Sequence, residues 1–163
     1  MKKGYLSLGS NLGDRMHNLE LAVLGLRSHG IDITALSDAY ETRAVEVPDE
    51  QGPYLNVVVE IRCGLEPFRI LEICRLVEDS LGRERPYHHA PRTIDIDILW
   101  LEDVGMETID LTIPHPGMEQ RSFVIHPLAQ IAPQLILPSG RPIMEVKNAL
   151  GYDEIIEICP MPR

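Results

Sequence analysis

Hydrophobic and polar residues alternate along four segments of the chain, and this period of two is typical of β-strands. These segments are residues 4–10, 31–40, 53–63 and 90–102. Between them, apolar residues recur at helical spacing in two places. One predicted helix follows Asp14 as its N-cap and ends at Gly30, and the other covers 66–82, with Pro67 in its first turn and Gly82 at its end.

The order strand, helix, strand, strand, helix, strand predicts a split βαβ unit, which is the ferredoxin-like α+β sandwich. In this fold both helices cover one face of an antiparallel sheet, so we expect the other face to be open. The segments after residue 123 predict short helices and a hairpin added to that core. With 163 residues, the chain is expected to form a single domain over 1–163.

The last strand carries two carboxylates, in "TIDIDILW". Asp95 and Asp97 share one face of this strand, about 7 Å apart, and the isoleucines share the other. Two such anions repel each other unless water, an arginine or a cation lies between them. They are therefore candidate metal ligands beside a groove, and the alternative is the solvated outer face of a half-buried strand.

Composition narrows the possible partners. The formal net charge of −10 argues against nucleic-acid binding, which requires a basic surface, but a local cluster can still attract a small anion. No apolar run is long enough to span a membrane and no signal peptide is recognised, so we expect a cytoplasmic protein. The three cysteines have no metal-ligand spacing, which predicts buried thiols.

A basic segment, "GRERPYHHAPRT", precedes the two aspartates in this acidic chain. Arg83, Arg85 and Arg92 offer planar forks that match phosphate oxygens, although a solvated loop that pairs with nearby acids would have the same composition. Carboxylates beside arginines suit a magnesium nucleotide, since Mg²⁺ takes oxygen ligands and arginines neutralise phosphate. His115, fixed between two prolines and followed by Arg121, is a further candidate for phosphate contact.

Five blocks, "GSNLGDR", "YLN", "GRER", "APRTIDIDIL" and "IPHPGMEQRSFVIHPLAQIAP", together resemble the hydroxymethyl-dihydropterin pyrophosphokinases of the folate pathway. The resemblance runs from about residue 4 to residue 138 with the blocks in the family's order. It implies a ferredoxin-like fold and the transfer of the terminal diphosphate of ATP to the hydroxymethyl group of 6-hydroxymethyl-7,8-dihydropterin, with release of AMP. It also implies Mg²⁺ (two ions) as the cofactor, and ATP and the pterin as the partners of a protein that we expect to be a monomer.

The resemblance assigns roles to individual positions. Asp95 and Asp97 match the ligands of the two Mg²⁺ ions, and with Arg83 and Arg92 they form the implied catalytic set. Positions that match ATP contacts are Glu78, Arg83, Arg85, Arg92, Ile98, Thr112, His115 and Arg121. Positions that match the pterin pocket are Thr42, Tyr54, Asn56, His89, Asp95 and Phe123. His89 stands where the family commonly has a tryptophan.

Two other functions are compatible with parts of the pattern. A non-catalytic ferredoxin-like module that binds a small ligand would explain the fold, but gives no reason for paired aspartates beside three arginines. A two-metal phosphodiesterase would need further carboxylate or histidine ligands for its metal ions, and the only candidates nearby in the sequence are His88 and His89. Formation of AMP from ATP and the pterin distinguishes the pyrophosphokinase from both.

Overall fold

A computed structural model describes residues 1–44, 51–82 and 93–162 of the chain. Within these residues one six-stranded sheet has the order β5-β1-β4-β3-β8, and β2 also pairs with β4. Its strands are β1 (Lys2–Ser10), β2 (Asp32–Leu36), β3 (Ala39–Thr42), β4 (Tyr54–Cys63), β5 (Asp95–Leu101) and β8 (Ile155–Cys159). The other elements are α1 (Arg15–Ser28), α2 (Pro67–Ser80), β6 (Met106–Glu107), β7 (Thr112–Ile113), the 3-10 helix η1 (Met118–Gln120), α3 (Ser122–Ile131) and α4 (Ile143–Leu150).

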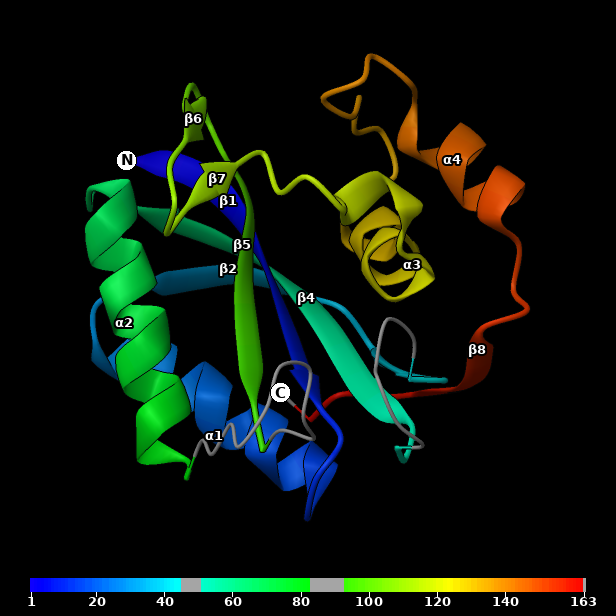
Figure 1. Cartoon of the computed structure of the whole chain (residues 1–163), viewed down its shortest axis with the longest axis horizontal. Helices are drawn as coiled ribbons and strands as arrows, with labels where there is room; N and C mark the ends of the chain where they lie inside the picture. Colours follow the sequence, from blue (N-terminus) through cyan, green and yellow to red (C-terminus); the bar gives the residue numbers. More distant parts are fainter. Residues whose placement is uncertain (45–50, 83–92, 163) are drawn as a thin grey trace.

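The predicted ferredoxin-like order is confirmed, and it places α1 and α2 together on one face of the sheet (Figure 1). Asp14 caps α1, because its side chain accepts a hydrogen bond from the N–H of His17 at 3.2 Å. Gly30 and Gly82 follow the two helices with φ of +90° and +80°, conformations that favour glycine. The core on this face joins residues of both helices to β1, β4 and β5 and contains the buried thiols of Cys63 and Cys74.

The segment expected to form one strand over 31–40 forms two, β2 and β3, which both pair with β4. The break lies at Ser37, whose hydroxyl accepts a hydrogen bond from the N–H of Val58 at 2.9 Å. The N–H of Val58 thus donates to a side-chain oxygen, whereas in a continuous strand pair it would donate to a main-chain carbonyl. The same hydroxyl donates to the carbonyl of Asp38 at 2.8 Å, and this bond stabilises the break between β2 and β3.

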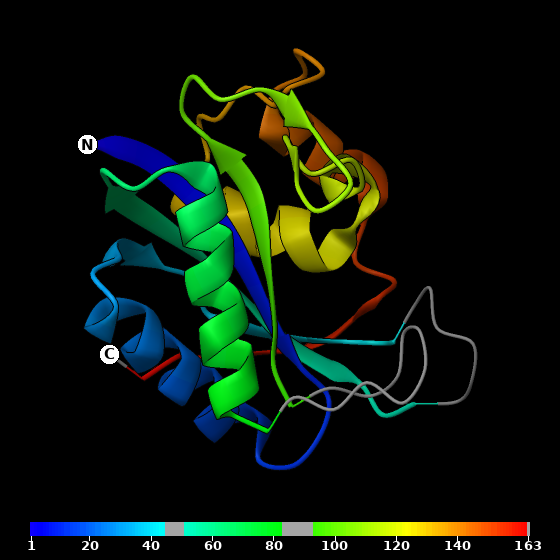
Figure 2. The ribbon, with the colours of Figure 1, turned by 60° about the vertical axis from the view of Figure 1, so that its left-hand side comes forward.

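The expectation that the second face of the sheet is open is wrong for part of that face. Helix α3 packs on it and forms a second core with Tyr5, Val58 and Leu99 (Figure 2). Leu99 reaches this core by the same alternation as Asp95 and Asp97, and a bulge after it lets Trp100 face this core too. Tyr5 pairs with Trp100 and Leu6 with Ile98, so Leu99 is the extra residue between the two pairs.

The C-terminal segment also differs from a simple addition to the core. A bridge between Ile136 and Pro142 and the helix α4 match the predicted hairpin and helix, whereas β8 was not predicted. β8 pairs with β3 and extends the sheet by one strand, after which Met161 enters the α1–α2 core, where it is 4% exposed. None of the helices in the described residues has the length and apolar character needed to cross a membrane.

Candidate functional site

One row of residues crosses four strands on the face of the sheet that is opposite α1 and α2, which we call the site face. Asp95 lies opposite Gly9, Gly9 opposite Asn56, and Asn56 opposite Tyr40. Directly opposed residues in antiparallel strands project to the same face, so this register places Asp95 and Asn56 on the same surface, about 10 Å apart, across two strand spacings. Because the residue between them is glycine, β1 itself contributes no side chain there, and the amide oxygen of Asn56 and the ring of Tyr54 lie close to the Gly9 backbone.

Asn56 lies in this row between Gly9 and Tyr40 and is buried, with 3% of its surface exposed. Its amide nitrogen donates to the hydroxyl of Thr42 at 2.9 Å and to the carbonyl of Tyr40 at 3.4 Å. Its carbonyl oxygen lies over Gly9, since a Cβ built there would be 2.8 Å from Oδ1. Tyr54 pairs with Thr42, so the structure brings together three of the residues that the sequence assigned to a pterin.

Asp95 and Asp97 lie at the β5 end of the row, on the strand next to β1. Asp97 lies opposite Ser7 as Asp95 lies opposite Gly9, so both carboxylates lie on the site face, while Ile96 and Ile98 belong to the α1–α2 core. This alternation is the predicted one. In the described part of the chain, no group of three or more His, Cys, Asp and Glu side chains is arranged to hold a metal ion. Two carboxylates nevertheless fit Mg²⁺, which commonly completes its shell with water and phosphate oxygens.

Two residues assigned to ATP support β5 from the other side. Glu78 is only 3% exposed, and its carboxylate accepts a hydrogen bond from the N–H of Ile96 at 2.8 Å. Since β5 is the edge strand, this bond satisfies a main-chain donor that has no strand beside it. The side chain of Ile98 is buried in the core, so a nucleotide could meet only its main chain.

Burial also controls the nearby thiol of Cys74. Desolvation raises its pKa far above the usual range, and the charges of Glu78 and Asp97 raise it further. The thiol therefore stays protonated and serves as a packing group. Tyr40 behaves in the same way, because burial and then the charge of Asp38 raise its pKa to about 12. Its hydroxyl donates to Oε1 of Gln130 at 3.0 Å.

A second cluster, formed by His115, Gly117, Arg121 and Phe123, lies beside β5. The N–H of His115 donates to the carbonyl of Leu99 at 2.8 Å, and its ring Nδ1 accepts from the N–H of Gly117 at 3.0 Å. The guanidinium of Arg121 lies 5.5 Å from the centre of the Phe123 ring, a cation–π contact. It also lies against Gly117, where a Cβ would meet Nε at 2.9 Å.

Thr112 lies in β7, opposite Glu107, and the residues after this strand lead to His115. The structure thus groups the assigned residues of the second half of the chain near the C-terminal end of β5, beyond the aspartates. Arg83, Arg85, His89 and Arg92 lie outside the described residues, so their roles stay predictions.

Two residues of this site were missed by sequence reasoning. Ser7 and Gly9 come from the first strand and face Asp97 and Asp95. The alternation in "GYLSLGS" contains the signal, because Leu6 and Leu8 are the core positions and the small residues fall between them. Their partners could not be read from the pattern, because the register of β1 with β4 and β5 depends on the folded sheet.

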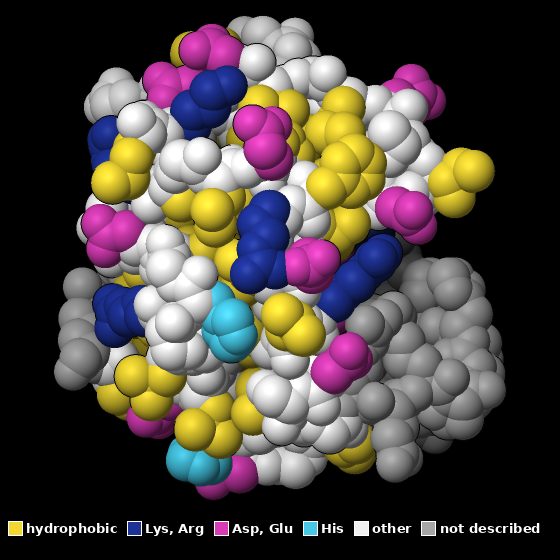
Figure 3. Space-filling model, turned by 90° about the vertical axis from the view of Figure 1, so that its left-hand side faces the viewer, with side chains coloured by type: hydrophobic (Ala, Val, Ile, Leu, Met, Phe, Trp, Pro, Cys, Tyr) yellow, Lys and Arg dark blue, Asp and Glu magenta, His cyan; other side chains and the backbone are white. Residues whose placement is uncertain are grey.

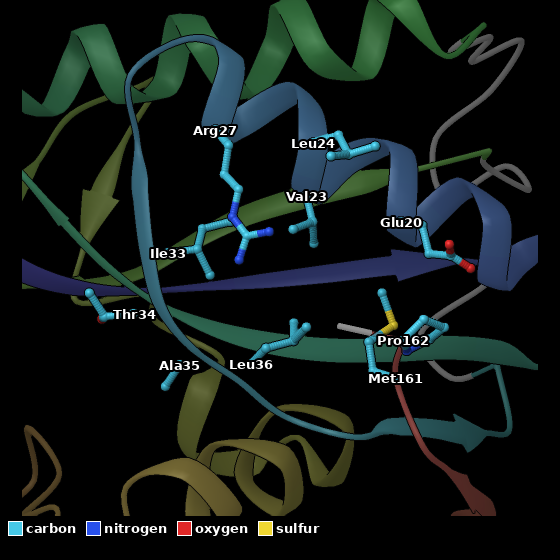
Figure 4. A pocket seen from close by; sticks show the side chains of 10 residues that line it. All are labelled: Glu20, Val23, Leu24, Arg27, Ile33, Thr34, Ala35, Leu36, Met161 and Pro162. Carbon is cyan, nitrogen blue, oxygen red and sulfur yellow. The ribbon is translucent and has the colours of Figure 1, made fainter.

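A pocket of about 360 Å³ lies elsewhere, on the α1 side of the sheet (Figure 4). Val23, Leu36 and Met161 contribute apolar walls, and Arg27 lies at its side. The pocket contains none of the predicted site residues. On the side of the molecule that carries α2, acidic, basic and apolar side chains are interspersed, with no single-sign surface (Figure 3).

The fold and the site together define a ferredoxin-like α+β protein with an acidic pair and a buried amide on one sheet face. A sequence model described as 7,8-dihydro-6-hydroxymethylpterin-pyrophosphokinase (HPPK) matches residues 5–133, and the chain belongs to this family. A 2-amino-4-hydroxy-6-hydroxymethyldihydropteridine pyrophosphokinase from Bacillus subtilis is 44% identical over 132 residues, which cover 80% of this chain and 78% of the relative. The enzyme of that name from Haemophilus influenzae is 32% identical over 161 residues, covering 98% and 100%.

Solved structures support the fold. The wild-type HPPK-DHPS of Plasmodium falciparum superposes with a TM-score of 0.69 at 14% identity, over 91% of this chain and 41% of that chain. This chain therefore spans less than half of the two-part protein that it resembles in structure. At this identity the likeness concerns the fold alone, and it confirms the predicted ferredoxin-like architecture.

Proposed function

We propose that this protein transfers the diphosphate of ATP to the hydroxymethyl group of 6-hydroxymethyl-7,8-dihydropterin, as a step of folate biosynthesis. The pterin hydroxyl oxygen forms a bond to the β-phosphorus, while the bond from that phosphorus to the α–β bridging oxygen breaks. AMP leaves with this oxygen, and the hydroxyl proton is released. The observation that supports this best is the row Asp95–Gly9–Asn56, which sets an acidic pair and a buried amide on one face of the sheet, in a member of this family.

In this proposal Asp95 and Asp97 hold Mg²⁺, which supplies charge neutralisation and orientation for the triphosphate when it is bound. The two carboxylates extend from a strand that is held on one edge by β1 and on the other by Glu78. They are therefore preorganised, which favours a reaction that depends on alignment more than on covalent assistance. Magnesium dependence is a proposal that removal of the metal tests directly.

The pterin lies at the Asn56 end. Because the amide nitrogen of Asn56 is engaged by Thr42 and Tyr40, its carbonyl oxygen is the group that lies over Gly9. In the part of the chain that the structure describes, this oxygen accepts no hydrogen bond. It is suited to accept from an N–H or amino group of the pterin ring. From the sequence resemblance, the ring of Phe123 in the second cluster would stack on the pterin.

The nucleotide lies toward the second cluster. His115 and Arg121 are fixed by main-chain and aromatic contacts near the end of β5, and they offer an imidazole and a guanidinium for phosphate oxygens. From the sequence resemblance, Arg83, Arg85 and Arg92 add positive charge, and Arg83 and Arg92 stabilise the charge that develops on the leaving AMP.

A product assay tests the proposal. Purified protein is incubated with ATP, Mg²⁺ and the pterin, and AMP and the pterin diphosphate are separated by chromatography. The expected result is equal formation of both products, with AMP absent when the pterin is omitted. Binding of both ligands without AMP would indicate a non-catalytic module, and AMP formation without pterin would indicate a phosphodiesterase. The Asp97→Asn variant serves as the inactive control.

The cytoplasmic location and the monomeric state complete the proposal. Light scattering coupled to gel filtration measures the molar mass in solution, and one chain of 18.4 kDa is the expected species. A dimeric mass would contradict the predicted monomer without affecting the proposed reaction.

A further inference from the structure

Arg15 is the first residue of α1, and its guanidinium connects this helix to two strands. One nitrogen, Nη2, lies 2.5 Å from a carboxylate oxygen of Glu41 in β3. The other, Nη1, donates to the carbonyl of Pro53, directly before β4, at 3.0 Å. The two side chains are only 29% and 18% exposed, so water screens this pair less than it screens a pair on the open surface.

Arg15 adds a full charge to the partial positive charge of a helix N-terminus, which the N-cap carboxylate of Asp14 offsets only in part. Glu41 carries a negative charge and lies directly opposite Glu157 in β8, so the two carboxylates repel each other. The Arg15–Glu41 ion pair offsets both charges. The same groups act on the thiol of Cys159: burial is the main cause that raises its pKa, the charges of Glu157 and Glu41 raise it further, and Arg15 lowers it.

The two contacts of Arg15 flank the last pair of the β3–β4 ladder, Glu41 one residue inside it and Pro53 one residue beyond it. Glu41 directly precedes Thr42, and Pro53 directly precedes Tyr54. Thr42 and Tyr54 are the terminal pair of the β3–β4 ladder, so Arg15 bridges the two strands at the end where the ladder stops.

Alternation of side chains makes this bridge relevant to the site. Glu41 projects toward α1, whereas the next residue, Thr42, projects to the site face and accepts the hydrogen bond of Asn56. A hydrogen bond of 3.0 Å from Asn11 to the side chain of Gln51 forms a second link between the β1–α1 loop and the residues before β4.

We propose that Arg15 is a positioning residue for the pterin end of the site. By joining Glu41 and Pro53, it holds the ends of β3 and β4 at the spacing that keeps Thr42 bonded to Asn56. This inference rests on the proposed function for its kinetic consequence. It predicts that loss of the Arg15 contacts weakens pterin binding, whereas the nucleotide, which lies toward the other end of β5, is affected little.

Steady-state kinetics with Arg15→Met tests the proposal. Because charged hydrogen bonds hold the strand ends, we expect the KM for the pterin to rise about tenfold. The KM for ATP should change little. Arg15→Lys should recover part of the loss, since one ammonium keeps the ion pair but cannot span both acceptors as a fork does. Glu41→Gln added to Arg15→Met should cause little further change, because the two residues act as a pair.

Arg27→Met is the matched control, because Arg27 lies in the same helix and its side chain makes no hydrogen bond or ion pair with a described residue. It should leave both KM values at the parent level. An unchanged pterin KM in Arg15→Met, or an equal rise for ATP and pterin, would overturn the proposal.

A measurement without substrate separates this inference from the proposed function. In ¹H–¹⁵N spectra, the side-chain amide signals of Asn56 should shift in Arg15→Met and stay in place in Arg27→Met. If the parent forms no AMP, the proposed function fails, and the amide shift still tests the positioning role. If the parent is active and the Asn56 signals do not move in Arg15→Met, the positioning role is wrong.

Discussion

Replacement of Gly9 by alanine tests the geometry of the site more directly than removal of a charged group. A Cβ at this position would lie 2.8 Å from Oδ1 of Asn56 and 3.4 Å from Cδ1 of Tyr54. An ordinary carbon–oxygen contact is about 3.3 Å or longer, so the Asn56 oxygen would have to retreat by about 0.5 Å. It cannot do so freely, because its amide nitrogen is bonded to Thr42 at 2.9 Å.

The expected cost combines overpacking, about 1–3 kcal/mol, with the partial loss of a hydrogen bond worth about 1 kcal/mol. For a domain of this size, each kcal/mol lowers Tm by about 2–4 °C, so Gly9→Ala should melt roughly 3–10 °C below the parent. Because the methyl group occupies the space above β1, pterin affinity should fall by about tenfold or more, a loss of at least about 1.4 kcal/mol.

Differential scanning calorimetry measures the first effect, and titration calorimetry with an ATP analogue and the pterin measures the second. Gly64→Ala is the control, since a Cβ at Gly64 has no atom within 4 Å. If Gly9→Ala melts and binds pterin like Gly64→Ala, the row from Asp95 to Asn56 is not the pterin surface and the reasoning from its register fails.

Three further predictions follow from other parts of the structure. Asp95→Ala and Asp97→Ala should each abolish AMP formation, whereas Tm measured without Mg²⁺ should hold or rise, because one carboxylate of a repelling pair is gone; retained turnover would contradict the metal assignment. Burial lowers the pKa of His126 from its usual 6.5, so below pH 6.5 the unfolded chain binds a proton at this ring more readily than the folded chain does. The urea concentration at the unfolding midpoint should therefore decrease as the pH is lowered, and decrease less in His126→Gln. Met161→Ala should cost about 2–4 kcal/mol, since this side chain is 4% exposed, whereas Met144→Ala at a 38% exposed position should cost little, as denaturant titrations would show.

Local patterns were sufficient to predict the ferredoxin-like core. The caps at Asp14, Gly30 and Gly82, and the alternation of isoleucine with Asp95 and Asp97, each depend on residues close in sequence. Such features are set by backbone preference and side-chain period, which the sequence displays directly.

What could not be predicted depends on contacts between distant segments. The split at Ser37 depends on a hydrogen bond to Val58, and the bulge between Ile98 and Trp100 lies where both Leu99 and Trp100 contact the second core. β8 does carry a strand signal, the isoleucine-rich run Ile155–Cys159 before Pro160, which was overlooked; its pairing with β3 depends on the folded sheet. Sequence resemblance supplied the site residues, but the close approach of Asn56 to Gly9 depends on the register of the strands and could not be predicted.

The small and polar residues of the site face also predict what happens when the protein is selected for thermostability. Ser7 and Asn56 are buried polar residues at central strand positions, where an apolar side chain of similar size would bury more apolar surface. A chain evolved for stability alone would place valine or leucine there, so these positions mark a trade-off between robustness and activity. Directed-evolution libraries that vary them should yield variants that resist heat but turn over no substrate. Stabilising changes that preserve activity are therefore best sought in the core beneath α1 and α2.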